Sequence, residues 1–144
     1  MRTTITPAQM QRLEQDFMVQ TGTPGILLME MAAQTVVEAV RRHAMRGSTV
    51  LFLCGPGNNG GDGYAAARLW RMDGGRSLVW ELSGQPKGDA AVNRTLLCLQ
   101  GVVPTGPEEN ISQGVACVVD ALFGTGLTRP LSGEAERLAL LCAE

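Results

Sequence analysis

Apolar positions in this chain alternate between short continuous runs and longer stretches with helical spacing. The runs predict strands, and the helical spacing predicts helices. The predicted strands cover residues 49–53, 77–82, 102–103 and 115–119. The predicted helices cover residues 7–20, 26–44, 64–72, 89–100 and 132–142. Thr6, followed by Pro7, is the predicted N-cap of the first helix, and Ser132 is the predicted cap of the last.

The alternation of strands and helices with short connections predicts an α/β fold. In such folds a mainly parallel sheet is covered by helices on both faces, and ligands bind beyond the carboxyl ends of the strands. Two glycine-containing loops, 55–63 and 120–130, each follow a predicted strand directly. We therefore expect the two loops to lie side by side at one edge of the sheet and to form one pocket.

Composition narrows the class of protein. The chain has 144 residues, 44% of them hydrophobic and 18% charged, which is typical of one globular domain. A net charge of −2 provides no basic surface for nucleic acid or for anionic membranes. No apolar run approaches the ~18 residues of a membrane span. We therefore expect no nucleic-acid partner and no membrane association.

The cysteines and methionines give two further predictions. The four cysteines form no Cys-x-x-Cys pair and are predicted to be buried free thiols, which favours a reducing compartment and thus the cytoplasm. They are Cys54, Cys98, Cys117 and Cys142. Four methionines of the first two helices either pack in the core, the interpretation we favour, or form the contact face of a homodimer. They are Met10, Met18, Met29 and Met31.

The first loop contains the glycine spacing of a dinucleotide-binding fingerprint. Gly55, Gly57 and Gly60 match Gly-x-Gly-x-x-Gly, and Glu81 falls near the end of the next strand, where a ribose-binding carboxylate is expected. These features favour a Rossmann dehydrogenase. A P-loop is excluded because no Gly-Lys-Ser/Thr follows.

The polar residues of the same loop argue against a simple pyrophosphate cradle. Asn58, Asn59 and Asp62 crowd the place where a phosphate needs bare backbone N–H groups. A carboxylate beside a phosphate is repulsive unless a cation lies between them. The purely structural alternative is a glycine turn in which Asp62 caps a helix that starts at Gly63.

Three segments together resemble the NAD(P)H-hydrate epimerase family, the YjeF N-terminal domain. Residues 55–68, Gly-Pro-Gly-Asn-Asn-Gly-Gly-Asp-Gly-Tyr-Ala-Ala-Ala-Arg, are similar to its signature. Residues 28–33, Leu-Met-Glu-Met-Ala-Ala, resemble its Leu-Met-Glu-x-Ala-Gly helix, with Ala33 in place of glycine. Residues 119–127, Val-Asp-Ala-Leu-Phe-Gly-Thr-Gly-Leu, resemble its second loop. The three motifs occur in the family's order and span most of the chain.

The resemblance implies a Rossmann-like three-layer α/β/α sandwich, as a single domain over 1–144, and a role in nicotinamide nucleotide repair. Family members interconvert the R and S forms of hydrated NADH and NADPH. An ADP- or ATP-dependent dehydratase, fused or separate, then acts on the S form. The resemblance also implies a potassium ion held by Asn59 and Asp120. It implies these substrate-binding residues: Asn58, Asn59, Gly60, Gly61, Asp62, Gly124, Thr125, Gly126, Leu127, Thr128, Arg129 and Pro130.

One family segment has no counterpart before Glu144. Family domains continue with a strand carrying Asp-x-Pro-Ser-Gly, which supplies the acid–base carboxylate and a serine ligand of the potassium ion. We therefore expect the domain to lack the family's C-terminal portion, to leave strand 115–119 as an exposed edge, and to contain no assignable catalytic residue. On its own the chain is expected to bind nucleotide weakly and to epimerise the R hydrate poorly. The alternative function is a non-catalytic nucleotide- or partner-binding module derived from the family.

Overall fold

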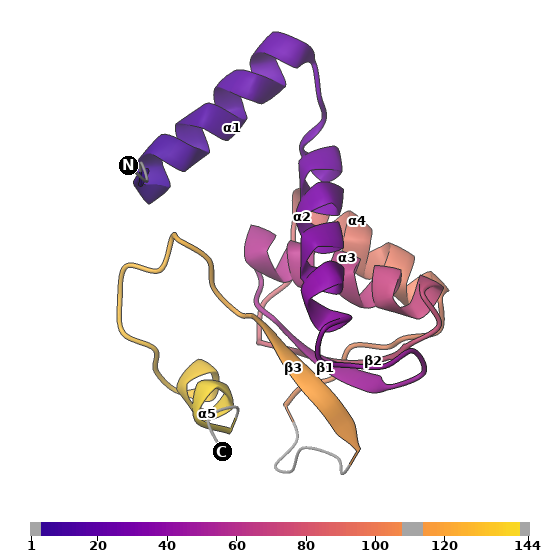
Figure 1. Cartoon of the computed structure of the whole chain (residues 1–144). Coiled ribbons are helices and arrows are strands. Elements are labelled where there is room, and N and C mark those ends of the chain that lie inside the picture. Colours follow the sequence, from indigo (N-terminus) through magenta and orange to yellow (C-terminus); the bar gives the residue numbers. More distant parts are fainter. Residues whose placement is uncertain (1–3, 108–113, 142–144) are drawn as a thin grey trace.

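The computed structural model of the chain describes residues 4–107 and 114–141. Helices and strands alternate after two initial helices (Figure 1). In chain order the elements are α1 Pro7–Thr21, α2 Gly25–Val40, β1 Thr49–Cys54, α3 Asn58–Met72, β2 Arg76–Glu81, α4 Gly88–Leu99, β3 Val115–Ala121 and α5 Glu134–Leu141. The predicted order of elements is confirmed except for the strand at residues 102–103.

The three strands form one parallel sheet in the order β2-β1-β3. In this register Leu53 lies opposite Trp80 and Asp120, so all three strands end at the same edge. Within the described residues, the outer side of β3 has no paired strand. The expectation that β3 is an exposed edge is confirmed for this part of the chain.

Helices cover both faces of the sheet, as expected for a three-layer α/β/α sandwich. One core lies between the sheet and α2, α3 and α4, and it includes Phe52, Tyr64 and Trp70. The other lies between the sheet and α5, and it includes Leu53 and Leu138. Consecutive residues of β1 alternate between the two cores because successive side chains of a strand point to opposite faces. β1 is therefore buried on both sides, and its carboxyl end is held rigidly.

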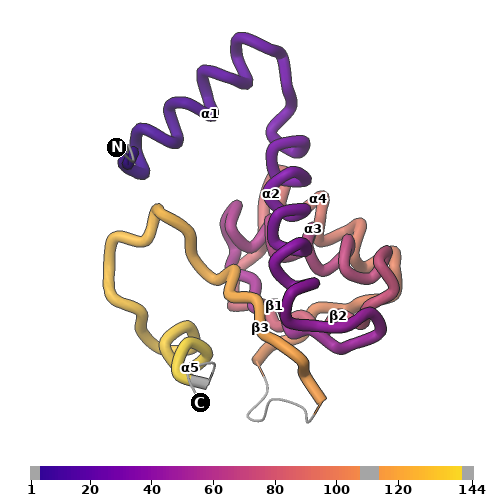
Figure 2. Tube along the Cα trace, viewed as in Figure 1, coloured from indigo at the N-terminus to yellow at the C-terminus, as the bar shows by residue number. Residues whose placement is uncertain are grey.

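Helix α1 stands away from this body (Figures 1 and 2). Its start agrees with the prediction, because Thr6 Oγ1 accepts a hydrogen bond from Gln9 N and the Gln9 side chain accepts one from Thr6 N. None of its residues is buried. Core packing of the methionines is wrong for Met10 and Met31, which are exposed, and is confirmed for Met29; Met18 is half-buried.

Three predicted boundaries differ from the structure for local reasons. Residues 102–103 form no strand; instead Thr105 bridges to Trp80, because Pro104 has no N–H to donate and Val102 packs in the core. Helix α2 ends at Val40, four residues early, in tighter turns such as His43 N to Val40 O.

Helix α5 begins at Glu134, because Gly133 adopts a left-handed conformation with φ 63° that leaves Ser132 outside the helix. The predicted end of this helix at residue 142 lies outside the described residues.

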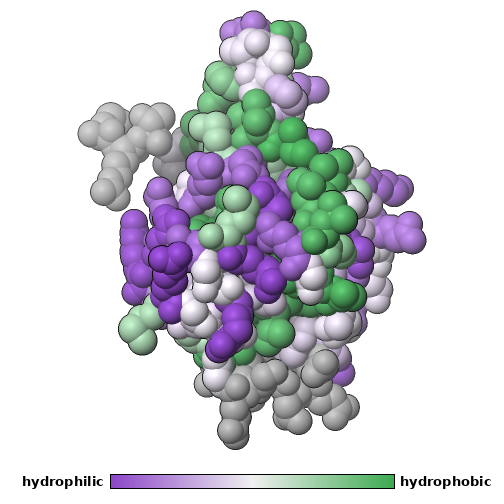
Figure 3. All heavy atoms as spheres, turned by 90° about the vertical axis from the view of Figure 1, so that its right-hand side faces the viewer, coloured by the Kyte–Doolittle hydropathy of each residue, from purple (hydrophilic) through white to green (hydrophobic). Residues whose placement is uncertain are grey.

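Several smaller predictions are also tested. Of the described cysteines, all free, Cys54 is buried, whereas Cys98 and Cys117 are only half-buried; the prediction for Cys142 lies outside the described residues. On the face seen in Figure 3, hydrophobic and hydrophilic residues are interspersed over the surface. No helix among residues 4–107 and 114–141 is both long and apolar enough to cross a bilayer.

Candidate functional site

Most of the predicted glycine loop 55–63 is helical in the structure. Helix α3 begins at Asn58, with Gly57 as its N-cap and no side-chain cap, so the prediction of a helix start near Tyr64 is wrong. The alternative in which Asp62 caps a helix from Gly63 is also wrong, because both residues lie inside α3. The N-terminus of α3 therefore sits at the carboxyl end of β1 with unpaired backbone N–H groups, which is a favourable place for an anion.

The glycines of this segment allow close approach rather than unusual backbone angles. None of the glycines from Gly55 to Gly63 has a positive φ. A Cβ atom on Gly60 would lie 1.7 Å from the carbonyl oxygen of Gly55. A Cβ atom on Gly63 would lie 2.7 Å from Ala121 Cβ and 2.8 Å from Cys54 Sγ. The first turns of α3 are thus pressed directly onto the ends of β1 and β3.

The second loop adjoins the first. Gly55 N donates a hydrogen bond to Ala121 O at 3.0 Å, and a Cβ atom on Gly55 would lie 1.8 Å from Leu122 O. A Cβ atom on Gly124 would lie 3.4 Å from Asn59 Oδ1. The expectation that the two loops meet at one edge of the sheet is confirmed.

The two residues expected to hold a cation both lie at this edge. Asp120 is exposed near the end of β3, and its Oδ1 accepts a hydrogen bond from Leu122 N at 3.0 Å. Asn59 is half-buried, with its amide oxygen near Gly124 of the second loop. An amide oxygen and a carboxylate are donors that suit a hard cation. The described residues contain no group of three or more His, Cys, Asp or Glu side chains that would hold a metal by themselves.

The other candidate residues divide between the two loops. Asn58, Gly60, Gly61 and Asp62 lie in the first two turns of α3. Residues 124–130 are exposed and form an open curve between β3 and α5 (Figure 1). Within it Leu127 N donates to Gly124 O at 3.3 Å. The structure brings Gly124 against Asn59 and leaves the rest of that segment facing solvent.

Residues 28–33 on α2, the Leu-Met-Glu-Met-Ala-Ala motif, pack against the first turns of α3. Met29 packs where a Cβ atom on Gly61 would lie, 2.7 Å from its Cε, and Asn93 Nδ2 of α4 contacts its sulfur at 3.2 Å. Glu30 forms an ion pair with Arg68 of α3, whose side chain is only 13% exposed. Sequence reasoning noted the motif without assigning these contacts. Its residues serve to position α3.

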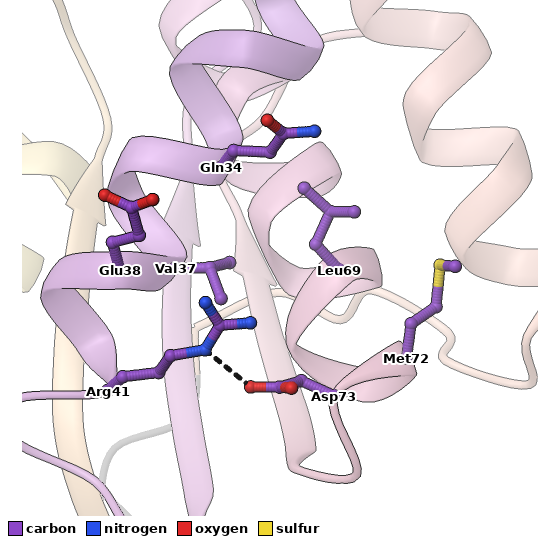
Figure 4. Close-up of a pocket in the computed structure, with 7 residues that line it drawn as sticks. All are labelled: Gln34, Val37, Glu38, Arg41, Leu69, Met72 and Asp73. Carbon is purple, nitrogen blue, oxygen red and sulfur yellow. Dashed lines mark hydrogen bonds and ion pairs between the residues drawn. The ribbon is translucent and has the colours of Figure 1, made fainter.

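A different hollow, of about 370 Å³, lies on the side of the molecule where β1 and β2 begin, away from the two loops (Figure 4). It is formed between α2 and α3 near the points where they lead into β1 and β2. Arg41 Nε pairs with Asp73 Oδ2 across it at 2.8 Å, beside Val37 and Leu69. Because its one cation, Arg41, is already paired with Asp73 and a second carboxylate, Glu38, also lines it, this hollow offers less to a nucleotide than the place where the two loops meet.

Residues 25–144 match the model of the family described as YjeF-related protein N-terminus. The chain belongs to this family.

Its curated relatives in this family include two proteins named NAD(P)H-hydrate epimerase. The one from Rhodobacter capsulatus is 37% identical over 90% of this chain and 65% of its own length. The one from Limosilactobacillus fermentum is 32% identical over 90% of this chain and 62% of its own length. A protein of Thermanaerovibrio acidaminovorans named bifunctional NAD(P)H-hydrate repair enzyme Nnr is 38% identical over 88% of this chain and 26% of its own. This chain thus spans less than two thirds of the length of these relatives.

A solved structure shares the fold. The crystal structure of yeast ynu0, YNL200c, aligns with a TM-score of 0.82 over 97% of this chain and 66% of that one, at 24% identity. The Rossmann-like α/β architecture of the YjeF-related domain is therefore shown both by the sheet itself and by this likeness.

One carboxylate of the YjeF-related domain has an unusual acidity. Burial, together with the nearby carboxylate of Glu14 on α1, raises the pKa of Asp62 to about 6. The ordinary pKa of an aspartate side chain, which applies in the unfolded chain, is 3.8. The folded state therefore binds the proton more tightly, and the ionised form of Asp62 destabilises it.

We expect Asp62→Asn to stabilise the domain at neutral pH. The parent should lose stability as pH rises from about 4 to about 6, and Asp62→Asn should not show that loss. After discounting for solvent screening, the difference at pH 7 is about 1 kcal/mol. Urea unfolding midpoints at pH 4.5 and pH 7 measure it, with Asp89→Asn as the control. Equal pH dependence of parent and Asp62→Asn would contradict the expectation.

Proposed function

We propose that this chain is the substrate-binding domain of an NAD(P)H-hydrate epimerase, an isomerase that interconverts the R and S forms of hydrated NADH and NADPH. The observation that carries the proposal is the contact between the two loops, in which Asn59 at the start of α3 lies against Gly124. The family motifs and the names of the curated relatives support it. The hydrated ring would lie between the two loops.

Each group at this edge has a chemical task in the proposal. Backbone N–H groups at the N-terminus of α3 would donate to the nucleotide phosphates. Asn59 and Asp120 would hold a potassium ion, which reduces the repulsion between Asp120 and the phosphates. Residues 124–130 would form the second wall around the substrate.

Acid–base chemistry is not assigned to a residue of this chain. Epimerisation requires a proton shuttle at the hydrated ring, and Asp62 and Asp120 are the carboxylates carried by the two loop segments. In our proposal both act in binding. The prediction that the 144-residue chain alone epimerises poorly therefore stands.

Partners and location follow from the same proposal. The S hydrate would pass to an ADP- or ATP-dependent dehydratase, in line with relatives named as bifunctional repair enzymes. We place the protein in the cytoplasm. The exposed side chains of Leu13 and Phe17 on α1 favour a homodimer in which this helix contacts a second copy.

The experiment that tests the binding site is a titration of the ¹⁵N-labelled chain with the R hydrate of NADH in potassium buffer. We expect amide shifts at residues 58–62 and 124–130, and about tenfold weaker binding in Asn59→Ala. Gln34→Ala, at the opposite edge of the sheet, is the matched control and should bind as the parent does. Shifts confined to the hollow between α2 and α3 would contradict the proposal.

A further inference from the structure

A hollow of about 340 Å³ lies at the carboxyl end of β2, on the other side of β1 from the second loop. We call it the β2 hollow. Its lining includes Glu81, the last residue of β2, the connecting residues Gly84 and Gln85, and Arg94 and Thr95 of α4. None of these residues belongs to the two loops of the proposed function.

A fixed charged cluster lies in the wall of the β2 hollow. Arg94 donates from Nε and Nη2 to the two carboxylate oxygens of Glu81, each at 2.7 Å. Tyr64 of α3 donates its hydroxyl to Glu81 Oε2 at 3.0 Å. The Arg94 hydrogen bonds hold the pKa of Glu81 below its ordinary value. Glu81 therefore stays ionised, and its orientation is set from two helices.

Both charged side chains remain partly open to the hollow. The side chain of Arg94 is 33% exposed and that of Glu81 is 22% exposed. Arg94 Nη1 makes no hydrogen bond to a residue of the described part of the chain. The cluster thus presents an acceptor, the Glu81 carboxylate, next to a free donor, the Arg94 Nη1 group.

The loop that lines the β2 hollow packs against the loop that leads into α3. A Cβ atom on Gly84 would lie 3.2 Å from Pro56 Cβ, so the loop after β2 contacts the loop after β1. The carboxyl edge of the sheet therefore offers three adjoining places in a row: the gap between the two loops, the start of α3, and the β2 hollow.

We infer that the β2 hollow binds the ribose of the adenosine half of the hydrated dinucleotide, with Glu81 accepting from a hydroxyl and Arg94 Nη1 donating to one. This inference rests on the proposed function, which puts the hydrated ring between the loops and the diphosphate at the start of α3. The far half of an extended dinucleotide then lies over the end of β2. Glu81 and Arg94 are assigned here as binding residues.

The charge of the cluster selects a free 2′-hydroxyl over a 2′-phosphate. The positive charge of Arg94 is already paired with Glu81 through two short hydrogen bonds, so little of it is left for a phosphate. The Glu81 carboxylate repels a phosphate placed in the hollow. The hydrate of NADH is therefore the preferred substrate over the hydrate of NADPH.

Three adenine nucleotides without nicotinamide test the inference on the full chain. ADP, 2′-deoxy-ADP and adenosine 2′,5′-bisphosphate are titrated separately against ¹⁵N-labelled protein. We expect ADP to shift the amides of Glu81, Gln85 and Arg94. We expect 2′-deoxy-ADP and the bisphosphate each to bind about tenfold more weakly than ADP.

Two variants separate the chemistry of the cluster from its structural role. Glu81→Gln removes the repulsive charge and releases Arg94, and it should reverse the preference between ADP and the bisphosphate. Thr95→Phe fills the hollow from an exposed position of α4 and replaces neither charged residue, and it should weaken ADP binding about tenfold. Thr95→Val is its matched control and should bind ADP as the parent does.

ADP shifts confined to residues 55–63 and 120–130, no ADP binding at millimolar concentration, or equal affinity for ADP and 2′-deoxy-ADP would each overturn the inference. The proposed function would survive all three, because it is measured with the hydrated ring. Conversely, ADP binding in the hollow together with no binding of the hydrate between the loops would support the subsite and refute the proposed function.

Discussion

Replacing Gly60 by alanine is expected to lower the free energy of unfolding by at least about 4 kcal/mol, a large part of the stability of a domain of this size. The new methyl group would lie 1.7 Å from the carbonyl oxygen of Gly55. The methyl carbon is fixed directly to the main chain and its neighbour is a main-chain carbonyl, so no side-chain rotation relieves the overlap. The first turn of α3 has to move away from the end of β1. Chemical denaturation of the purified variant measures the loss.

Gly57→Ala is the matched control three residues earlier. A Cβ atom on Gly57 meets nothing within 4 Å, and its φ of −96° suits any L residue. We expect its stability to stay within about 1 kcal/mol of the parent. Equal stability of Gly60→Ala and the parent would refute the close packing of α3 on β1.

Replacing Asp120 by asparagine is the second large effect, this time on activity. In the proposal the Asp120 carboxylate holds a cation beside the substrate phosphates, and the variant keeps the shape while removing the charge. In the complete protein encoded by the gene, loss of one charged interaction of this kind should lower the epimerisation rate, followed by NADH recovery in a coupled assay, by about 10- to 100-fold. The potassium concentration that gives half-maximal activity should rise at the same time.

Asp73→Asn is the control for charge removal. Asp73 lies at the opposite edge of the sheet and pairs with Arg41 in a largely exposed ion pair (Figure 4). Its loss should leave the rate and the potassium dependence unchanged. If Asp73→Asn and Asp120→Asn behaved alike, the assignment of a cation to Asp120 would be wrong.

The sequence predicted the three strands of the sheet and the meeting of the two loops because these depend on patterns read over short windows. The buried run of β1 and the start of α1 at Thr6 and Pro7 are local signals that the structure confirms. The meeting of the two loops followed from a general property of parallel sheets.

The start of α3 was not predictable in the same way. Residues 58–63 contain three glycines and two asparagines, which have low helix propensity. The segment is helical because its glycines let it pack onto Gly55, Cys54 and Ala121, which are contacts made by tertiary structure. The ion pair of Glu30 with Arg68 was missed for the same reason, since the two residues are distant in sequence.

Glu81 shows how a pattern and the structure each supply part of an assignment. Its place at the end of β2 was visible in the sequence. Its fixation by Arg94 and Tyr64, on two different helices, was not. The pattern identified a carboxylate, and the structure shows that this carboxylate is paired, ionised and open to a hollow.

The most direct test of the account is a coupled assay on the complete protein encoded by the gene, whatever its length. The R hydrate of NADH is supplied with an S-specific dehydratase in potassium buffer, and recovery of NADH is followed. We predict recovery far above the spontaneous rate of epimerisation. A complete protein that recovers NADH no faster than the spontaneous reaction would contradict the central claim that this chain serves an NAD(P)H-hydrate epimerase.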